Sequence, residues 1–111
     1  MYLLGYSLGG DEAIWLANRL AENNITVDLL ITFDPHPQRI GRGNYTVTNV
    51  TTALNFYQNN PVKIGPNTYR GAEVKGAINF ELKSSDHISI VSDALNQHRL
   101  TIFGALVLPS N

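Results

Sequence analysis

Gly5-Tyr6-Ser7-Leu8-Gly9-Gly10 is the stretch around which the rest of the chain is organised. A short apolar run, Tyr2-Leu3-Leu4, precedes it, and a segment with helical periodicity, Asp11 to Glu22, follows it. The pattern predicts a strand, a sharp glycine-containing turn with a serine at its centre, and then a helix. A serine at the apex of such a turn projects its hydroxyl into solvent, which is what a nucleophilic serine requires.

The residues beside the serine fit this interpretation. Gly5 and Gly9 lack a Cβ, so the strand and the helix can approach each other closely. The N–H of Leu8 falls at the free N-terminus of the helix, where it is suited to stabilise a developing oxyanion. One alternative is a glycine-rich turn with an incidental serine. Another is a dinucleotide-binding turn, which is disfavoured because Ser7 occupies the position of a required glycine and no acidic residue follows at the ribose position.

The composition indicates one globular domain, residues 1–111. Hydrophobic residues make up 43% of the chain and charged residues 15%, which separates it from disordered sequences. The net charge is −1 without a basic run, so nucleic acid is not an expected partner. No apolar stretch has the length of a membrane span. The chain lacks cysteine, which excludes disulfides and thiolate chemistry, and no motif indicates a cofactor or a metal site.

The first helix is expected to turn one stripe of small and apolar residues toward a sheet. The stripe consists of Ala13, Leu16, Ala17, Leu20 and Ala21. Trp15 lies off the stripe and is expected to pack against a neighbouring segment.

Three further strands and a second helix are expected downstream. Val27 to Phe33 has the nearly continuous apolar character of a buried parallel strand. Val50 to Tyr57 and Ala77 to Leu82 predict the third and fourth strands, while 35–46 and 58–71 carry loop and turn signals. We expect a parallel sheet with the strands in sequential order, with antiparallel pairing of the fourth strand as the alternative. Apolar spacing predicts a C-terminal amphipathic helix marked by Ile88, Val91, Leu95, Ile102 and Leu106.

A nucleophilic serine needs a base, and the base needs an orienting acid. Among the three histidines, His98 falls on the apolar face of the last helix and is interpreted as a packed residue, while His36 follows the second strand. His87 lies in a polar loop after the fourth strand and is the candidate base. Ser7, Asp34 and His87 each follow a predicted strand, and the carboxyl ends of parallel strands share one rim. The three side chains are therefore expected to meet.

The order Ser, Asp, His is the order of the α/β-hydrolases. With the elbow around Ser7, the Asp34-Pro35 pair after a buried strand and the Asp86-His87 pair before a helix, the chain resembles the C-terminal half of a lipase- or esterase-like α/β-hydrolase over essentially all of its residues. The resemblance implies a partial α/β-hydrolase fold with about four mainly parallel strands and flanking helices. It also implies a serine hydrolase of ester or thioester bonds, acting on a small-molecule or lipid ester, with Leu8 in the oxyanion hole. The chain is then expected to be a truncated piece of a longer enzyme.

The assignment of the acid rests on elimination. In many family members the acid follows the third of these strands, but here that strand runs into Gln58-Asn59-Asn60, which has no carboxylate. Glu73 lies far into the next connection, and Asp86 is adjacent to His87, a spacing that seldom allows the required hydrogen bond. Asp34 is therefore the candidate acid. Its alternative role is to accept hydrogen bonds from loop N–H groups before Pro35.

The sequence also departs from the family. The family's N-terminal half, which supplies a neighbour for the elbow strand and a second oxyanion donor, has no counterpart here. We therefore expect Tyr2-Leu3-Leu4 to form an apolar sheet edge through which the chain self-associates. The second hypothesis is a catalytically inactive fragment or interaction module that pairs through this edge. No signal peptide precedes the strand, which slightly favours the cytoplasm and leaves the compartment open.

Overall fold

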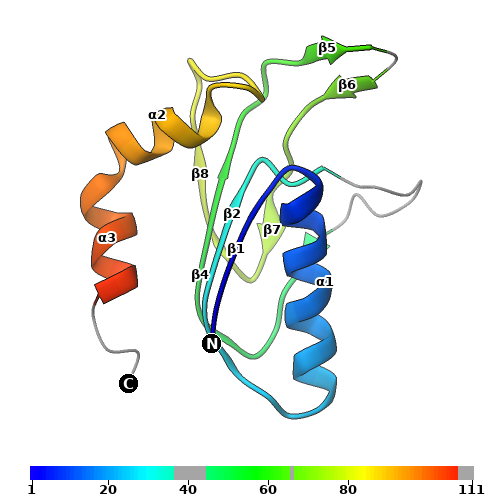
Figure 1. The fold of residues 1–111 in the computed structure, drawn as a ribbon, viewed down its shortest axis with the longest axis vertical. Coiled ribbons are helices and arrows are strands. Elements are labelled where there is room, and N and C mark those ends of the chain that lie inside the picture. The colour runs from blue at the N-terminus through cyan, green and yellow to red at the C-terminus, as the bar shows by residue number, and fades with distance from the viewer. Residues whose placement is uncertain (37–44, 66, 108–111) are drawn as a thin grey trace.

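The computed structural model describes residues 1–36, 45–65 and 67–107. Its central feature is a four-stranded parallel sheet with the strand order β1-β2-β4-β8 (Figure 1). The strands are β1 (Tyr2–Tyr6), β2 (Val27–Phe33), β4 (Val50–Tyr57) and β8 (Ile78–Glu81). The predicted mixed α/β class and sequential order are confirmed. The antiparallel alternative for the fourth strand is wrong, because β8 pairs with β4 in parallel.

Helices cover both faces of this sheet, α1 on one side and α2 with α3 on the other (Figure 1). Their bounds are Leu8–Glu22, Ile90–Gln97 and Arg99–Val107. Neighbouring residues of β2 serve opposite layers: Leu30 belongs to the apolar cluster beneath α1, whereas Leu29 and Ile31 belong to the cluster that includes Ile90 and Ile102 of α2 and α3. Burial on both faces explains why β2 is apolar almost without interruption.

The helix α1 faces the sheet with a stripe slightly different from the predicted one. Ala13 and Ala17 are buried as expected, but Ile14 is buried with them, and Leu16 is 39% exposed. Trp15 is 49% exposed, and the Arg19 guanidinium of the same helix lies 5.6 Å from its ring centroid, while its expected packing against another segment stays a prediction. The buried stripe runs through Gly10, Ala13/Ile14 and Ala17, which leaves positions 15 and 16 toward solvent.

The C-terminal segment forms two helices instead of the single predicted helix. His98 separates α2 from α3, with a non-helical φ of −123°. The ring of His98 packs against Phe80 at 4.9 Å and Phe56 at 5.3 Å between centroids, which confirms its interpretation as a packed residue. Ile88 is 67% exposed in the turn before α2, so it does not belong to the apolar stripe.

Two small pairs of strands lie outside the four predicted strands. Parallel pairing joins β3 (Tyr45–Thr46) to β7 (Val74–Lys75), and antiparallel pairing joins β5 (Val62–Ile64) to β6 (Asn67–Tyr69). The β5–β6 hairpin lies beyond the carboxyl end of the main sheet (Figure 1). In the described part of the chain, no helix has the length and apolar character needed to cross a bilayer.

Candidate active site

Ser7 occupies a strained turn between β1 and α1. Its backbone has φ 58° and ψ −120°, a region that non-glycine residues rarely adopt. The turn is held by a hydrogen bond from the Ser7 N–H to the Phe33 carbonyl (3.0 Å) and by the N–H groups of Gly10 and His36, which donate to the Ser7 carbonyl at 3.0 and 3.1 Å. Backbone strain secured in this way is typical of functional sites.

The glycines of the elbow have different roles. A Cβ at Gly5 would lie 2.2 Å from the Gly9 carbonyl oxygen, so the close approach of β1 to α1 requires glycine at position 5. A Cβ at Gly9 would meet nothing within 4 Å, and the expectation that Gly9 itself must lack a Cβ is wrong. Gly10 faces Pro35, whose Cα would lie 3.2 Å from an added Cβ. Glycine is therefore required at position 5, because a side chain there would collide with the backbone of Gly9.

The structure brings Ser7, His87 and Asp34 together in one chain of hydrogen bonds. His87 Nε2 lies 2.9 Å from Ser7 Oγ, and His87 Nδ1 lies 2.6 Å from Asp34 Oδ2. His87 is 4% exposed, Asp34 is fully buried and Ser7 is partly exposed. When Nδ1 carries the proton and donates to Asp34, Nε2 is free to accept the proton of the Ser7 hydroxyl.

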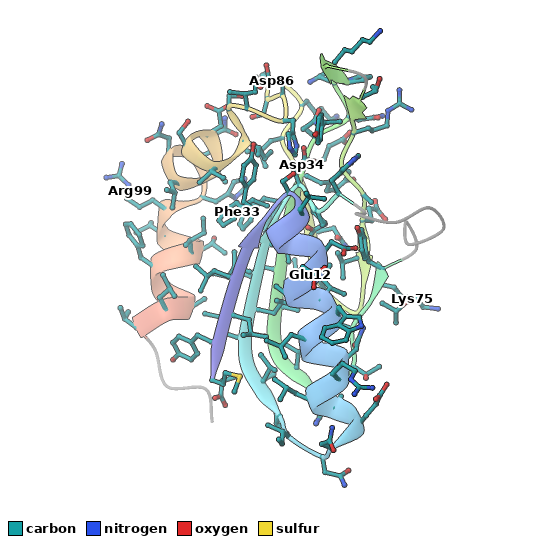
Figure 2. The ribbon with its side chains drawn as sticks, turned by 45° about the vertical axis from the view of Figure 1, so that its right-hand side comes forward. Glu12, Phe33, Asp34, Lys75, Asp86 and Arg99 are labelled. Carbon is teal, nitrogen blue, oxygen red and sulfur yellow. The ribbon has the colours of Figure 1, made fainter. Side chains whose placement is uncertain are left out.

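The other two carboxylates considered as acids have different partners. Oδ1 of Asp86 accepts hydrogen bonds from the N–H groups of Ile88 and Ser89, each at 2.9 Å, and so closes the turn that leads into α2. These backbone bonds, led by that of Ser89, hold the pKa of Asp86 below its ordinary value. Glu73 accepts a hydrogen bond from the Tyr57 hydroxyl at 3.0 Å. Figure 2 shows Asp34 and Asp86 at the same end of the molecule.

Asp34 is held from several directions. Its backbone is in the left-handed region, with φ 49°, and its N–H donates to the Phe56 carbonyl at 2.7 Å. Gln58 donates to the carboxylate twice, from its backbone N–H to Oδ1 (3.3 Å) and from its side-chain Nε2 to Oδ2 (2.8 Å). A Cβ at Gly71 would lie 1.8 Å from Asp34 Oδ1, so the carboxylate needs glycine at that position.

Two tyrosine rings enclose the imidazole of His87. Tyr6 stacks on it at 5.1 Å between centroids and Tyr69 at 4.4 Å, with interplanar angles of 25° and 18°. The Tyr6 hydroxyl also donates to the His87 carbonyl at 2.6 Å, and burial, with the nearby charge of Asp34, raises the pKa of that hydroxyl. His36 packs on Tyr69 at 4.5 Å, and its pKa is lowered by burial and then by the charge of His87.

Leu8 is the first residue of α1, so its N–H lies ahead of the helical hydrogen-bond ladder. This N–H directly follows the nucleophile in the sequence and lies at the N-terminus of α1, and its role as an oxyanion donor stays a prediction. The Leu8 side chain is 41% exposed.

Sequence reasoning missed four residues of the site. Gln58 stands directly after the third strand, so its place at the rim was a usable signal, although only carboxylates were sought there. Tyr6 immediately precedes the nucleophile. Tyr69 and Gly71 belong to the segment interpreted as turns, and nothing in their local pattern points to His87 or Asp34.

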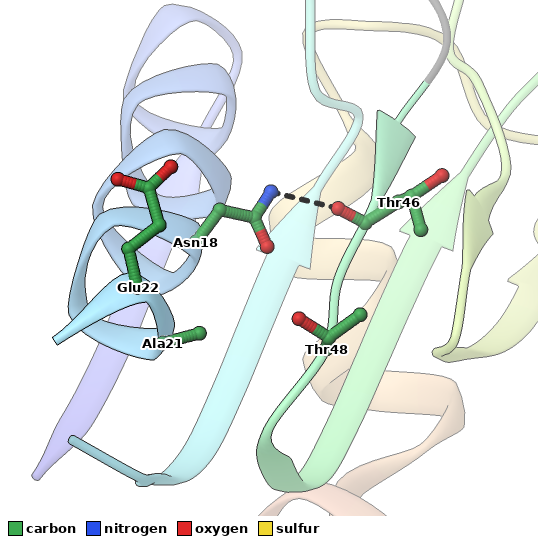
Figure 3. A pocket seen from close by; sticks show the side chains of 5 residues that line it. All are labelled: Asn18, Ala21, Glu22, Thr46 and Thr48. Atoms are coloured by element: carbon green, nitrogen blue, oxygen red, sulfur yellow. Dashed lines mark hydrogen bonds between the residues drawn. The ribbon is translucent and has the colours of Figure 1, made fainter. Parts of the chain in front are cut away.

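A separate surface cavity of about 440 Å³ lies between α1 and the segment around β3. It is lined by Asn18, Ala21, Glu22, Thr46 and Thr48 (Figure 3). Asn18 Nδ2 donates to the Thr46 carbonyl across it at 2.8 Å, and none of the lining residues belongs to the serine–histidine–aspartate chain. Within 1–36, 45–65 and 67–107, no group of three His, Cys, Asp or Glu side chains is placed to hold a metal ion.

Comparisons of the chain with models of protein families, with curated proteins and with solved structures gave no match.

Proposed function

We propose that this protein is a serine hydrolase of ester or thioester bonds, built on part of an α/β-hydrolase-like fold. The proposal is carried by one observation: Ser7 Oγ, His87 and Asp34 form a continuous hydrogen-bonded chain of 2.9 and 2.6 Å at the carboxyl rim of a parallel sheet. The strained backbone at Ser7 supports it, because a nucleophile elbow requires this conformation.

In this proposal, His87 Nε2 takes the proton from the Ser7 hydroxyl while Oγ attacks the carbonyl carbon of the substrate. Asp34 keeps the imidazole in the required tautomer and stabilises the imidazolium that forms. The Leu8 N–H stabilises the oxyanion. The imidazolium then gives its proton to the leaving alcohol or thiol, and a water molecule activated by His87 hydrolyses the acyl-enzyme.

A fluorophosphonate probe tests the nucleophile. We expect the probe to label the protein at Ser7 and Ser7→Ala to abolish both labelling and hydrolysis of short- and long-chain p-nitrophenyl esters. The exposed Ser92, whose hydroxyl bonds only the Ser89 carbonyl among described groups, supplies a matched control, and Ser92→Ala should label normally. Turnover by Ser7→Ala at the wild-type rate would refute the proposal.

A second candidate function is an interaction module that pairs through the outer edge of β1. In the described residues β1 pairs only with β2, and Tyr2, Leu4 and Tyr6 on it are 44%, 53% and 42% exposed. An exposed apolar edge strand is a template for pairing with another chain. Light scattering over a range of concentrations separates the two candidates, because a monomeric protein that labels at Ser7 has no need of the edge for its activity.

A further inference from the structure

Gln58 is a buried polar side chain that the mechanism above does not use. Its exposed fraction is 0%, and its amide has partners at both ends. Nε2 donates to Asp34 Oδ2 at 2.8 Å, and Oε1 accepts the Asn60 N–H at 2.6 Å. Because the acceptor end is occupied by a backbone N–H, the donor end must face the carboxylate. The orientation of the amide is thereby fixed.

Gln58 and His87 meet at the same carboxylate oxygen. Asp34 Oδ2 is the partner of His87 Nδ1 at 2.6 Å and of Gln58 Nε2, while Oδ1 receives the Gln58 backbone N–H at 3.3 Å. The terminal torsion of an aspartate is broad, so a carboxylate without such contacts rotates easily. Gln58 binds both oxygens and therefore sets the plane that the imidazole encounters.

The segment that holds the acid also holds the loop that carries the base. Asn60 Nδ2 donates to the Lys83 carbonyl at 2.6 Å and to the Ser85 carbonyl at 2.8 Å, two residues before His87. Residues 58–60 therefore connect the end of β2, through Asp34, to the loop after β8. The same short segment therefore fixes the position of the acid, Asp34, relative to the loop that carries the base, His87.

We propose that Gln58 is a positioning residue that keeps the Asp34 carboxylate correctly turned toward His87. This inference rests on the proposed hydrolase function. Two substitutions test it. Gln58→Met keeps the length of the side chain and removes all hydrogen bonds of the side-chain amide, to Asp34, to the Tyr69 carbonyl and from the Asn60 N–H. Gln58→Glu is nearly isosteric and, when protonated, still donates a hydrogen bond to Asp34.

The two variants should differ in their dependence on pH. Gln58→Met should lower kcat about 10- to 100-fold, the range for the loss of a hydrogen bond to a charged group, with KM unchanged because residue 58 is buried. Its profile should keep the wild-type shape. In Gln58→Glu, the ionised form of the new carboxyl adds a negative charge beside Asp34 and so favours the imidazolium. The acidic limb of kcat/KM should therefore move to higher pH in that variant.

The titratable groups around His87 are the same in both variants, apart from residue 58 itself. In the described part of the chain, Asp34 accepts a hydrogen bond from the ring, and Tyr6 and Tyr69 stack on it. The ring centroid of His36 lies 6.4 Å from that of His87, and Asp86 is the preceding residue. A shift of the limb in Gln58→Glu that is absent in Gln58→Met is therefore assigned to position 58.

A second readout is independent of hydrolysis. The proton between His87 and Asp34 should give a far-downfield NMR resonance, assigned by its loss in His87→Gln. We expect this resonance to shift or broaden in Gln58→Met. Thr32→Val is the matched control, since it removes another buried hydrogen bond, Thr32 Oγ1 to Asn55 Oδ1 at 2.7 Å, in which no triad side chain takes part. It should lower the thermal midpoint without changing the resonance or the rate.

Wild-type turnover, pH profile and resonance in both Gln58 variants would overturn this inference. A failure of the proposed function looks different. In that case Ser7→Ala would retain the activity of the wild-type protein, while the NMR comparison would still decide the role of Gln58.

Discussion

The side chains at the carboxyl ends of the four strands and those along the outer edge of β1 differ in burial and in hydrogen bonding. At the carboxyl ends, Asp34, Gln58 and Ser85 are 1% exposed or less, and each has a hydrogen-bond partner from another segment. Along β1, Tyr2 and Leu4 are 44% and 53% exposed, and the strand pairs on one side only among the described residues. These three buried side chains at the rim are all hydrogen-bonded, whereas the edge presents apolar and backbone groups to solvent.

This difference in hydrogen bonding indicates that the side-chain geometry is specific at the rim and not at the edge of β1. Buried polar groups are tolerated only when they are bonded, so the rim has few arrangements of comparable energy. An exposed edge imposes no such limit and accepts many partners. Tyr6 lies where the two regions meet: its hydroxyl bonds the His87 carbonyl, while the residue as a whole is 42% exposed at the end of β1.

The strongest test of the rim is Asp34→Asn. If Asp34 orients His87, the amide should leave the fold intact and lower kcat on the order of 10⁴-fold, because an amide favours the wrong tautomer. The hydrolysis of p-nitrophenyl esters measures the rate, and circular dichroism verifies the fold.

Asp86→Asn is the matched control for the acid. Asp86 caps the turn before α2 through its Oδ1, and an asparagine oxygen accepts the same two N–H groups. This variant should retain turnover within a few-fold of wild type. The opposite pattern, with a loss in Asp86→Asn and none in Asp34→Asn, would show that the acid is wrongly assigned.

The elbow offers a matched pair of glycines for a test of stability. Gly5→Ala places a Cβ 2.2 Å from the Gly9 carbonyl oxygen, and since both partners are backbone atoms it should lower the free energy of unfolding by about 1–3 kcal/mol or more. Gly9→Ala has open space in a helix and should raise it by up to about 1 kcal/mol. Urea denaturation measures both, and equal effects of the two substitutions would contradict the close approach at Gly5.

The sequence predicted the main sheet because strand and helix periods are local properties. The apolar run of β2 and the spacing of α1 are each visible within a few residues. The break between α2 and α3 at His98 depends on contacts with distant residues, because the His98 ring packs on Phe56 of β4 and Phe80 of β8. The apolar spacing of the sequence runs through this break and therefore predicted a single helix. Residues 45–46 and 74–75 pair only through contacts between distant segments, and no local pattern indicates that pairing.

The site was predicted to a similar extent. Ser7, Asp34 and His87 were found because each follows a strand, and parallel strands bring their carboxyl ends to one rim. The hydrogen bonds between them bear out that expected proximity. Gly71 and Tyr69 were missed because their roles depend on contacts with Asp34 and His87 across 37 and 18 positions of the sequence, respectively.

A lysine on the exposed edge of β1 tests whether the chain self-associates through that strand. Leu4 is 53% exposed, so Leu4→Lys should change the free energy of unfolding by less than about 0.5 kcal/mol while preventing pairing along the strand. Ile78→Lys on β8, at the other side of the sheet and 58% exposed, introduces the same charge as a control. We expect self-association in wild type and Ile78→Lys and its loss in Leu4→Lys, measured by light scattering. A wild-type protein that is monomeric at all concentrations would contradict this expectation.

The smallest expected effect concerns His36, which packs at the rim on Tyr69. Burial, followed by the charge of His87, lowers the pKa of His36 below its ordinary value of 6.5. Below pH 6.5 the unfolded chain therefore takes up a proton that folded His36 accepts only at lower pH, so the free energy of unfolding falls as the pH falls through this window.

His36→Gln removes this contribution. Between about pH 7 and pH 5 it should lose less stability than wild type, as measured by the urea midpoint at each pH. Leu4 lies on the edge of β1 and is not in contact with His36 in any described ring interaction, so Leu4→Lys should keep the wild-type dependence of stability on pH. Parallel pH curves for wild type and His36→Gln would show that the packing of His36 against Tyr69 leaves its protonation as easy as in the unfolded chain.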